Sequence, residues 1–331
     1  MKASSDTILV TGAAGFVGSH FARAAHDAGA RVLALDDLST TSSWPALPPA
    51  IERVVGDVGD PTLVTQLVAD RGVAAIIHFA GRIQVGESTR NPGLYFEQNL
   101  ARTSRLLDAA TQAAGDRTLS FVLSSSAAVY GQPEHSPIVE ASATRPINPY
   151  GASKLAAEVV LEAYARSRGV RWAALRYFNA AGAHQDGTLR ERHDPETHLI
   201  PLAIDAALQL RSPLVVYGDD YATHDGTCLR DYVHVMDLAD AHLAALVLLA
   251  RGESVGALNL GSERGSTVRE ILAEVARAAG RPVPHDVGSR RDGDPTKLVA
   301  SAAKAAQILG WRPSRNLTMI VEDALRARRH P

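Results

Sequence analysis

Cysteine, aromatic residues and net charge are all scarce in this chain. Its 331 residues include one cysteine, Cys228, and aromatic residues make up 5%. A single cysteine excludes an internal disulfide and any metal site built from cysteine alone, and it fits a reducing compartment. The 34 Lys and Arg residues nearly balance the 36 Asp and Glu residues, a net charge of −2, which argues against nucleic acid as a partner. We therefore expect a cytoplasmic protein with no nucleic-acid partner.

Long apolar runs are also missing. No stretch approaches the roughly 20 apolar residues that a membrane helix needs. The opening segment MKASSDTILVTG has no apolar run before its first strand-like stretch, so we expect neither a signal peptide nor a membrane partner. Apolar residues nevertheless make up 46% of the chain, enough to bury a large core. At roughly 150 residues per domain, the length predicts about two domains.

Short apolar runs alternate with helix-length segments in the first part of the chain. Runs such as Ala74–Phe79 are almost wholly apolar, as in strands that are buried on both faces of a parallel sheet. Repeated alternation indicates right-handed βαβ units, so we predict an α/β fold with a Rossmann-type doubly wound parallel sheet. The expected strands are Thr7–Thr11, Arg31–Asp36, Ile51–Val55, Ala74–Phe79, Ser120–Ser124, Arg171–Tyr177, Pro213–Tyr217 and Ala257–Leu260. The expected helices include Val17–Ala28, Thr62–Asp70, Asn99–Ala114, Tyr150–Arg168 and Val235–Ala250.

A glycine-rich turn joins the first expected strand to the first helix. Gly12 allows a tight turn, Gly15 lets the backbone approach a pyrophosphate, and Gly18 lets the helix pack closely on the strand. The amides near Phe16 and Val17, at the positive end of the helix dipole, would face the phosphates. The strand–turn–helix context predicts a dinucleotide site, although the spacing is GxxGxxG rather than GxGxxG.

An acidic pair ends the second expected strand, eighteen residues after the last glycine of the turn. Asp36 or Asp37, next to Leu38, can accept hydrogen bonds from an adenosine ribose and would repel a 2′-phosphate. The pair therefore favours NAD over NADP. Further expected cofactor contacts, at the ends of the third and fourth strands, are Asp57, Val58, Phe79, Ala80 and Gly81.

The alternation fades after about residue 180, where polar segments such as Ala183–His198 and Gly218–Arg230 begin. We predict a NAD-binding Rossmann domain over residues 1–180 and a smaller α/β substrate-binding domain over residues 181–331. Elements near 235–260 are expected to return to the first sheet.

Tyr150 and Lys154 lie four residues apart in a helix-favouring segment, so they share one helix face. An ammonium beside a phenol favours the phenolate and lowers a pKa that is ordinarily about 10. Such a phenolate can take the proton of a sugar hydroxyl while hydride leaves the same carbon for nicotinamide. The Ser126 hydroxyl, after a neighbouring strand, can bond the same oxygen. The combination predicts an enzyme rather than a pure binding protein.

The order of these motifs resembles the extended short-chain dehydrogenase/reductases, and within them the UDP-glucose 4-epimerases, also called UDP-galactose 4-epimerases. The matching blocks cover nearly the whole chain: TGAAGFVGSH, SSSAAVYG, PYGASK, LRYFNAAGAH, YGDDYATHDGTCLRDYVHVMDLADAH and RRDGDP. The resemblance implies an isomerase of carbohydrate metabolism that interconverts UDP-glucose and UDP-galactose through a transient 4-keto sugar. It makes NAD the cofactor and a UDP-sugar the substrate.

The resemblance also implies roles for individual residues. Tyr150 would be the base, Ser126 its hydroxyl partner and Lys154 its electrostatic support. Arg230 and Arg291 would clamp the diphosphate, for which a guanidinium fork is apt. Further residues implied near the cofactor are Asn99, Ser124, Tyr177 and Phe178. Those implied near the nucleotide sugar are Asn179, His198, Leu199, Tyr217, Asp294 and Leu298.

The chain departs from the family pattern at several positions. Arg82-Ile83-Gln84 replaces a common Leu-Lys-Ala, and Ala180 stands at a usual proline. His198 occupies a position where an asparagine often touches the substrate phosphates. Leu298 occupies the position that screens the substituent on sugar C2, which leaves acceptance of N-acetylated UDP-sugars open.

Two alternatives compete with this interpretation: another nucleotide-sugar enzyme of the same fold, and a non-catalytic NAD-binding protein. A 4,6-dehydratase needs an Asp–Glu pair just after the Ser-rich strand, where this chain has Ala127 and Ala128. A UDP-glucuronate epimerase or decarboxylase is not excluded by the residues. A non-catalytic NAD sensor would have no use for an activated phenol.

Two further expectations concern metal and assembly. The histidines show no tight metal-ligand spacing, so we predict no metal. The resemblance implies a homodimer built from the helices at Asn99–Ala114 and Tyr150–Arg168, and a monomer is the alternative.

Overall fold

A seven-stranded parallel sheet forms the centre of the computed structural model, which describes residues 7–291 and 294–330. Its strand order is β3-β2-β1-β4-β5-β6-β11, a Rossmann order with the last strand drawn from far along the chain. The predicted α/β fold with a doubly wound sheet is therefore confirmed. The strands of this sheet are β1 (Thr7–Thr11), β2 (Arg31–Asp36), β3 (Glu52–Val55), β4 (Val73–His78), β5 (Ser120–Ser126), β6 (Arg171–Tyr177) and β11 (Gly256–Leu260).

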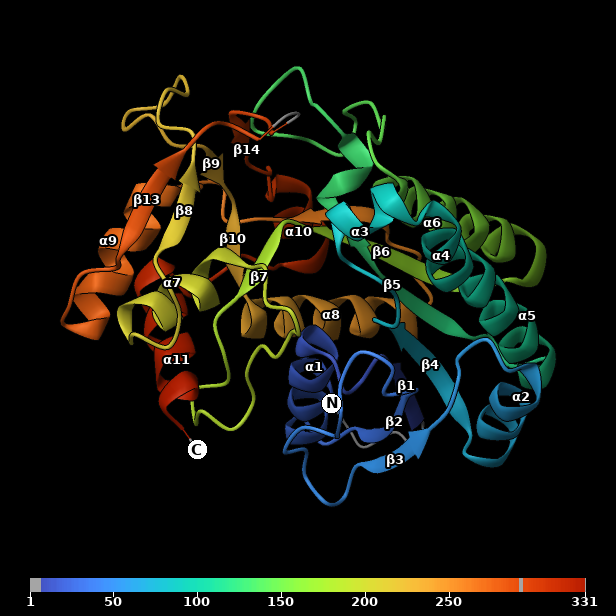
Figure 1. Ribbon diagram of the computed structural model, residues 1–331. Coiled ribbons are helices and arrows are strands. Elements are labelled where there is room, and N and C mark those ends of the chain that lie inside the picture. The colour runs from blue at the N-terminus through green and yellow to red at the C-terminus, as the bar shows by residue number, and fades with distance from the viewer. Residues whose placement is uncertain (1–6, 292–293, 331) are drawn as a thin grey trace.

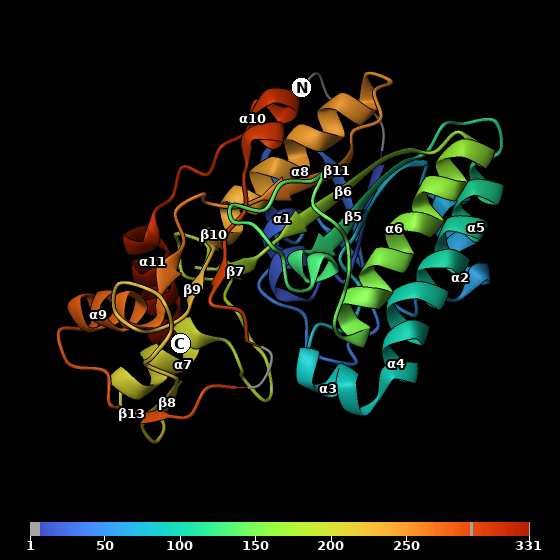
Figure 2. The same cartoon turned by 90° about the horizontal axis from the view of Figure 1, so that it is seen from above.

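Helices cover both faces of this sheet (Figure 2). On one face, α2, α5 and α6 bury residues such as Leu67, Leu106 and Leu161; on the other, α1 and α8 bury Phe21 and Leu249. No helix within the described residues is long and apolar enough to cross a membrane. The helices and short helical turns around the sheet are α1 (Phe16–Asp27), α2 (Pro61–Asp70), α3 (Val85–Arg90), α4 (Pro92–Phe96), η1 (Glu97–Ala101), α5 (Arg102–Ala114), η2 (Ala127–Tyr130), α6 (Pro149–Arg168), α8 (Val235–Ala250) and α10 (Ala303–Leu309).

The later part of the chain builds a second lobe beside the carboxyl ends of the sheet strands (Figure 1). Three helices bury a separate core that includes Ile204, Ile271 and Leu325. These helices are α7 (Leu199–Ala207), α9 (Val268–Ala279) and α11 (Leu317–Arg329). The short strands of this part of the chain pair as β10-β7, β12-β9-β14 and β13-β8. Their bounds are β7 (Asn179–Ala181), β8 (Leu214–Tyr217), β9 (Leu229–Arg230), β10 (Tyr232–His234), β12 (Ser266–Thr267), β13 (His285–Gly288) and β14 (Lys297–Leu298).

Two elements return from the later part of the chain to the first sheet. β11 pairs in parallel with β6, and α8 packs against α1. The expected helix at Asn99–Ala114 differs in its first turn, because residues Glu97–Ala101 form a π-helical turn before α5 begins at Arg102. The π turn buries the Asn99 side chain, which has a structural task described below.

Candidate active site

The glycine turn between β1 and α1 is closed by backbone contacts that leave no room for side chains. A Cβ on Gly12 would lie 2.5 Å from the backbone nitrogen of Ala80, and a Cβ on Gly18 would lie 2.1 Å from the Gly12 carbonyl oxygen. Gly12 also has a positive φ of 67°. Gly15 is the N-cap of α1 and makes no side-chain cap, so the first amides of α1 remain available to phosphate. This cradle fits a dinucleotide pyrophosphate, with Phe16 beginning the helix.

Asp36 ties the glycine turn to the end of β2. Its Oδ2 accepts a hydrogen bond from the Ala14 amide and its Oδ1 one from the Leu38 amide, each at 2.9 Å. Burial raises the pKa of Asp36, and these two amides oppose the rise. Each carboxylate oxygen keeps a second lone pair for a ribose hydroxyl.

The sequence reasoning missed an arginine that joins the two acids expected near the adenosine. Nη1 of Arg102 lies 3.3 Å from Asp37 and 3.0 Å from Asp57. Asp37, Arg102 and the buried Val58 line a groove that also contains Gly12 and Gly15. Arg102 is one turn along the chain after the expected Asn99, but no local pattern indicates its acidic partners.

The segment after β4 forms one wall of this groove, with Phe79, Ala80 and Gly81 among its lining residues. The Phe79 ring also packs on His242 in the core, with ring centroids 4.9 Å apart. Asn99 uses its amide to hold this segment: Oδ1 accepts from the Arg82 amide at 2.7 Å, and Nδ2 donates to the Arg82 carbonyl at 3.0 Å. A direct contact between Asn99 and the cofactor stays a prediction.

Ser126, Tyr150 and Lys154 are brought to the carboxyl end of β5 by the strand and by the first turns of α6. The Asn148 side chain caps α6 by accepting a hydrogen bond from the Gly151 amide at 2.9 Å, and Pro149 begins the helix. Lys154 is buried, and its Nζ donates to the Ser124 carbonyl at 2.9 Å. The same Nζ lies 3.7 Å from the position that a Cβ on Gly81 would occupy. The Lys154 ammonium therefore lies next to Gly81, which lines the same groove as the glycine turn.

The pKa of Tyr150 is raised in the structure, whereas the sequence predicted that it would be lowered. Burial raises the pKa of the Tyr150 phenol, and interaction with the Ser126 hydroxyl only partly opposes this rise. The ammonium of Lys154 is directed to the Ser124 carbonyl, and burial lowers its own pKa to about 8 despite the nearby Glu158. The prediction was wrong for the protein alone because both groups are desolvated, which penalises their charged forms.

A buried ion pair between Glu158 and Arg176 connects α6 to β6. Both carboxylate oxygens of Glu158 accept from the Arg176 guanidinium, at 2.5 and 2.9 Å, and Glu158 also accepts from the Ser125 hydroxyl. Glu158 lies four residues after Lys154, about one turn further along α6. That spacing was visible in the sequence, but the partner on β6 was not.

The three expected residues at the end of β6 and just after it contact different partners. The Tyr177 hydroxyl shares a hydrogen bond with Ser124, and burial raises the pKa of Tyr177. Phe178 packs beside Tyr130, whereas the Asn179 side chain donates to the Asp231 carbonyl at 2.7 Å. Tyr177 is thus the one of the three directed at the Ser-rich strand end.

Four residues expected around the nucleotide gather at one place in the second lobe. Nη2 of Arg230 and Nε of Arg291 lie 3.3 and 3.2 Å from the two oxygens of Asp294. The Arg291 guanidinium lies over the Tyr217 ring, 4.8 Å from its centroid. Leu298 pairs with Arg230 across β14 and β9. Residues 292–293 of the RRDGDP block lie outside the described residues.

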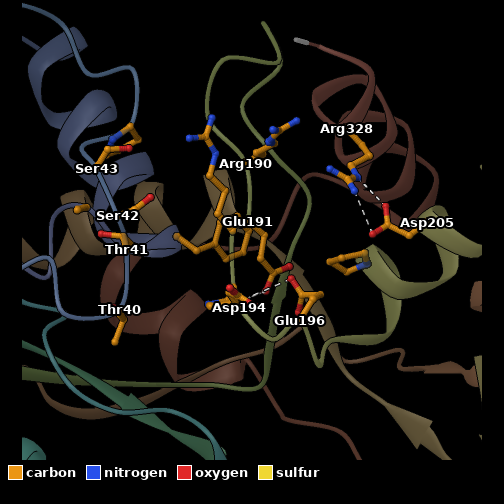
Figure 3. Close-up of a pocket in the computed structure, with 16 residues that line it drawn as sticks. Thr40, Thr41, Ser42, Ser43, Arg190, Glu191, Asp194, Glu196, Asp205 and Arg328 are labelled. Atoms are coloured by element: carbon orange, nitrogen blue, oxygen red, sulfur yellow. Dashed lines mark hydrogen bonds and ion pairs between the residues drawn. The ribbon is translucent and has the colours of Figure 1, made fainter. Parts of the chain in front are cut away.

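His198 and Leu199 lie elsewhere, at the start of α7. His198 is the N-cap of that helix, and Leu199 packs on the core of the second lobe. Near His198 lies a cavity of about 330 Å³ between the loop after β2 and the segment before α7 (Figure 3). It is lined by Ala14 and Phe16 of the glycine turn, by Thr40–Ser43 and by Glu191. The sequence reasoning missed this cavity because its walls come from distant parts of the chain.

Comparisons with known proteins define the class. Residues 8–261 match the model of the NAD dependent epimerase/dehydratase family, and the chain belongs to that family. A UDP-glucose 4-epimerase of Rhizobium meliloti is 45% identical over 321 residues, which cover 97% of this chain and 96% of the relative.

Two solved structures are also similar over nearly their whole length. UDP-glucose 4-epimerase from Brucella ovis, in complex with NAD, has a TM-score of 0.91 at 44% identity and covers 97% of each chain. The enzyme from Bifidobacterium longum, in complex with NAD⁺ and UDP, has a TM-score of 0.89 at 34% identity, covering 97% of this chain and 98% of the other.

Proposed function

We propose that this chain interconverts UDP-glucose and UDP-galactose by inverting the configuration at C4, with NAD held at the glycine turn. The observation that supports it most directly is the position of Lys154, one turn after Tyr150 on α6, next to Gly81 of the groove that also contains Gly12 and Gly15. In this proposal residues 1–180 hold the cofactor and residues 181–331 hold the nucleotide sugar.

Tyr150 acts as the base in this reaction. It takes the proton of the sugar 4-hydroxyl while hydride leaves C4, and it returns the proton when the same hydride comes back to the opposite face of the rotated 4-keto sugar. NAD, when bound, supplies the hydride acceptor and a positive ring. That charge opposes the desolvation that raises the Tyr150 pKa in the protein alone. Ser126 orients the reacting hydroxyl, and Lys154 supplies the ammonium.

The nucleotide half of the substrate is the anchor. Arg230 and Arg291 can each turn from Asp294 toward a diphosphate, and Tyr217, 44% exposed, offers a ring beside the uracil. Binding energy concentrated on the nucleotide leaves the hexose free to rotate, as inversion requires. Ala127 and Ala128, in η2 directly after β5, cannot supply the acid–base pair of a dehydratase.

The proposal also covers the substrate range and the oligomeric state. Leu298, at the position that screens the substituent on sugar C2, packs with Phe178 against the cluster that contains Tyr130. We expect UDP-galactose to be turned over faster than UDP-N-acetylgalactosamine or UDP-glucuronate. We propose a homodimer through α5 and α6 and a cytoplasmic location, which the single, buried Cys228 suits.

Replacement of Tyr150 by Phe tests the proposal. Because loss of a general base costs about 10²- to 10⁴-fold, kcat with UDP-galactose should fall by about 10³-fold in a coupled assay. NAD released from the denatured variant should match the wild-type content. The control is Tyr164→Phe, which removes a phenol further along α6 and should keep kcat. Near-normal kcat in Tyr150→Phe would refute the base assignment.

A further inference from the structure

Four side chains that can bind a metal converge in the segment between β7 and α7. They are Glu191, His193, Glu196 and His198, and one donor atom of each lies within 4.8 Å of the other three. They occupy alternate or near-alternate positions in eight residues, E-x-H-x-x-E-x-H. None of them belongs to the Ser126, Tyr150 and Lys154 group.

The distances among these donor atoms are those of a small coordination shell. Nδ1 of His193 lies 3.2 Å from Glu191 Oε1 and 3.6 Å from Glu196 Oε2. Nδ1 of His198 lies 3.2 Å from Glu196 Oε1 and 2.7 Å from Glu191 Oε1. Ligands at about 2.1 Å from a tetrahedral ion are about 3.4 Å apart, so three of the four separations already fit. The fourth, 2.7 Å between His198 Nδ1 and Glu191 Oε1, must open by about 0.7 Å.

The two imidazole nitrogens are buried without a hydrogen bond. Nδ1 of His193 and Nδ1 of His198 are shielded from solvent, and neither is aligned with a carboxylate oxygen despite the short separations. Glu191 is itself buried, with 7% of its side chain exposed. Glu196, with 17% of its side chain exposed, adds a second partly shielded carboxylate, and the pair needs positive charge nearby. Two protonated histidines would supply that charge, but a dication would also satisfy both unaligned nitrogens.

The surrounding backbone orients the cluster. Oε1 of Glu196 accepts hydrogen bonds from the amides of Thr197 at 2.7 Å and His198 at 2.8 Å, which sets the direction of its carboxylate. Glu191 and Glu196 lie close together on the wall of the cavity that includes Ala14 and Phe16 (Figure 3).

We propose that Glu191, His193, Glu196 and His198 bind one divalent transition-metal ion of the Zn²⁺ class. Two imidazoles with two carboxylates suit such an ion better than Mg²⁺ or Ca²⁺, which favour oxygen ligands alone. Four protein ligands close the coordination shell, as in structural sites. The ion orders the segment before α7, which lines one cavity together with Ala14 and Phe16 of the glycine turn. This inference does not depend on the proposed reaction.

The test uses tag-free, full-length protein that has been treated with a chelator and then freed of it. Titration calorimetry with Zn²⁺ should give one site per chain, and Mg²⁺ should give none. The variant Glu191→Gln/His193→Gln should weaken Zn²⁺ binding by at least about 100-fold, because it removes two direct ligands. A Zn²⁺-dependent rise in Tm should disappear with it.

The matched control removes an exposed Glu–His pair elsewhere. His224 and Glu270 lie 3.3 Å apart on the surface, and His224→Gln/Glu270→Gln should bind Zn²⁺ like the wild type. Circular dichroism checks folding, and the single variant His193→Gln replaces the double variant if the latter does not fold. Absence of Zn²⁺ binding in the wild type, or equal binding in the ligand variants, would overturn the proposal.

Discussion

His78 lies at the end of β4 between two threonine hydroxyls, 2.7 Å from Thr11 Oγ1 and 2.9 Å from Thr103 Oγ1. Burial lowers its pKa to about 3, and the charge of Lys154 adds to this effect. His20 and His242 are also buried, and burial lowers the pKa of each to about 4. These three residues stay neutral in the folded protein at pH values where the unfolded chain binds protons.

The sign of the resulting pH dependence follows from proton binding. Between about pH 6.5 and pH 4 the unfolded state binds more protons, so the free energy of unfolding falls as pH falls. Each histidine contributes about 1.4 kcal/mol per pH unit in that range, and three contribute about 4. His78→Gln should therefore reduce the slope by about 1 kcal/mol per pH unit, measured by denaturant unfolding between pH 6.5 and 5. His135→Gln, at an exposed position, should leave it unchanged. An unaltered slope in His78→Gln would contradict this account.

At the scale of the element, the start of α6 decides where the reactive phenol lies. Gly151 packs against η2, and a Cβ there would lie 2.4 Å from the backbone oxygen of Ala128. Because a backbone atom cannot move aside cheaply, the first turn of α6 is held at a fixed distance from the end of β5. Tyr150 and Lys154 are carried by that turn and the next.

Gly151→Ala should displace this turn and lower kcat by about 100-fold, since a shift of about 1 Å at a reacting group can cost that much. Its Tm should fall as well. Gly93→Ala is the matched control: Gly93 lies in the helix α4 with open space around it, so the variant should keep kcat and gain slightly in stability. If Gly151→Ala retains wild-type kcat, the contact with Ala128 does not position Tyr150.

At the scale of the whole molecule, the outer surface of α6 is the part that the proposed dimer would cover. Ala157 and Leu161 face the sheet and are fully buried, whereas Val159 is 61% exposed on the same helix. In the proposed dimer, the second copy of the chain covers this exposed apolar side chain.

Val159→Arg should convert the proposed dimer into a monomer, because it places a charge in an apolar interface. Light scattering after size-exclusion chromatography should give half the wild-type mass. Val287→Arg, on β13 of the second lobe, introduces the same charge at a position that is 51% exposed and should stay dimeric. A monomeric wild type, or a dimeric Val159→Arg variant, would contradict the assignment of this surface.

The sequence alone was sufficient for the main sheet, the glycine turn and the Tyr150–Lys154 helix. Each of these depends on neighbours in the chain: apolar runs that must be buried on both faces, glycines that a tight turn requires, and two side chains one helical turn apart. The roles of Arg230 and Arg291 were predicted from resemblance to a known family, and no local physical pattern in the sequence indicated them.

Only the tertiary structure decided which distant groups meet and how deeply they are buried. It directed Lys154 to the Ser124 carbonyl, raised rather than lowered the Tyr150 pKa, and joined Arg102 to Asp37. It also brought Glu191 and His198 to one point, although their spacing indicated no site. Chain-local patterns set backbone conformation, whereas desolvation and charge pairing depend on packing between segments far apart in the sequence.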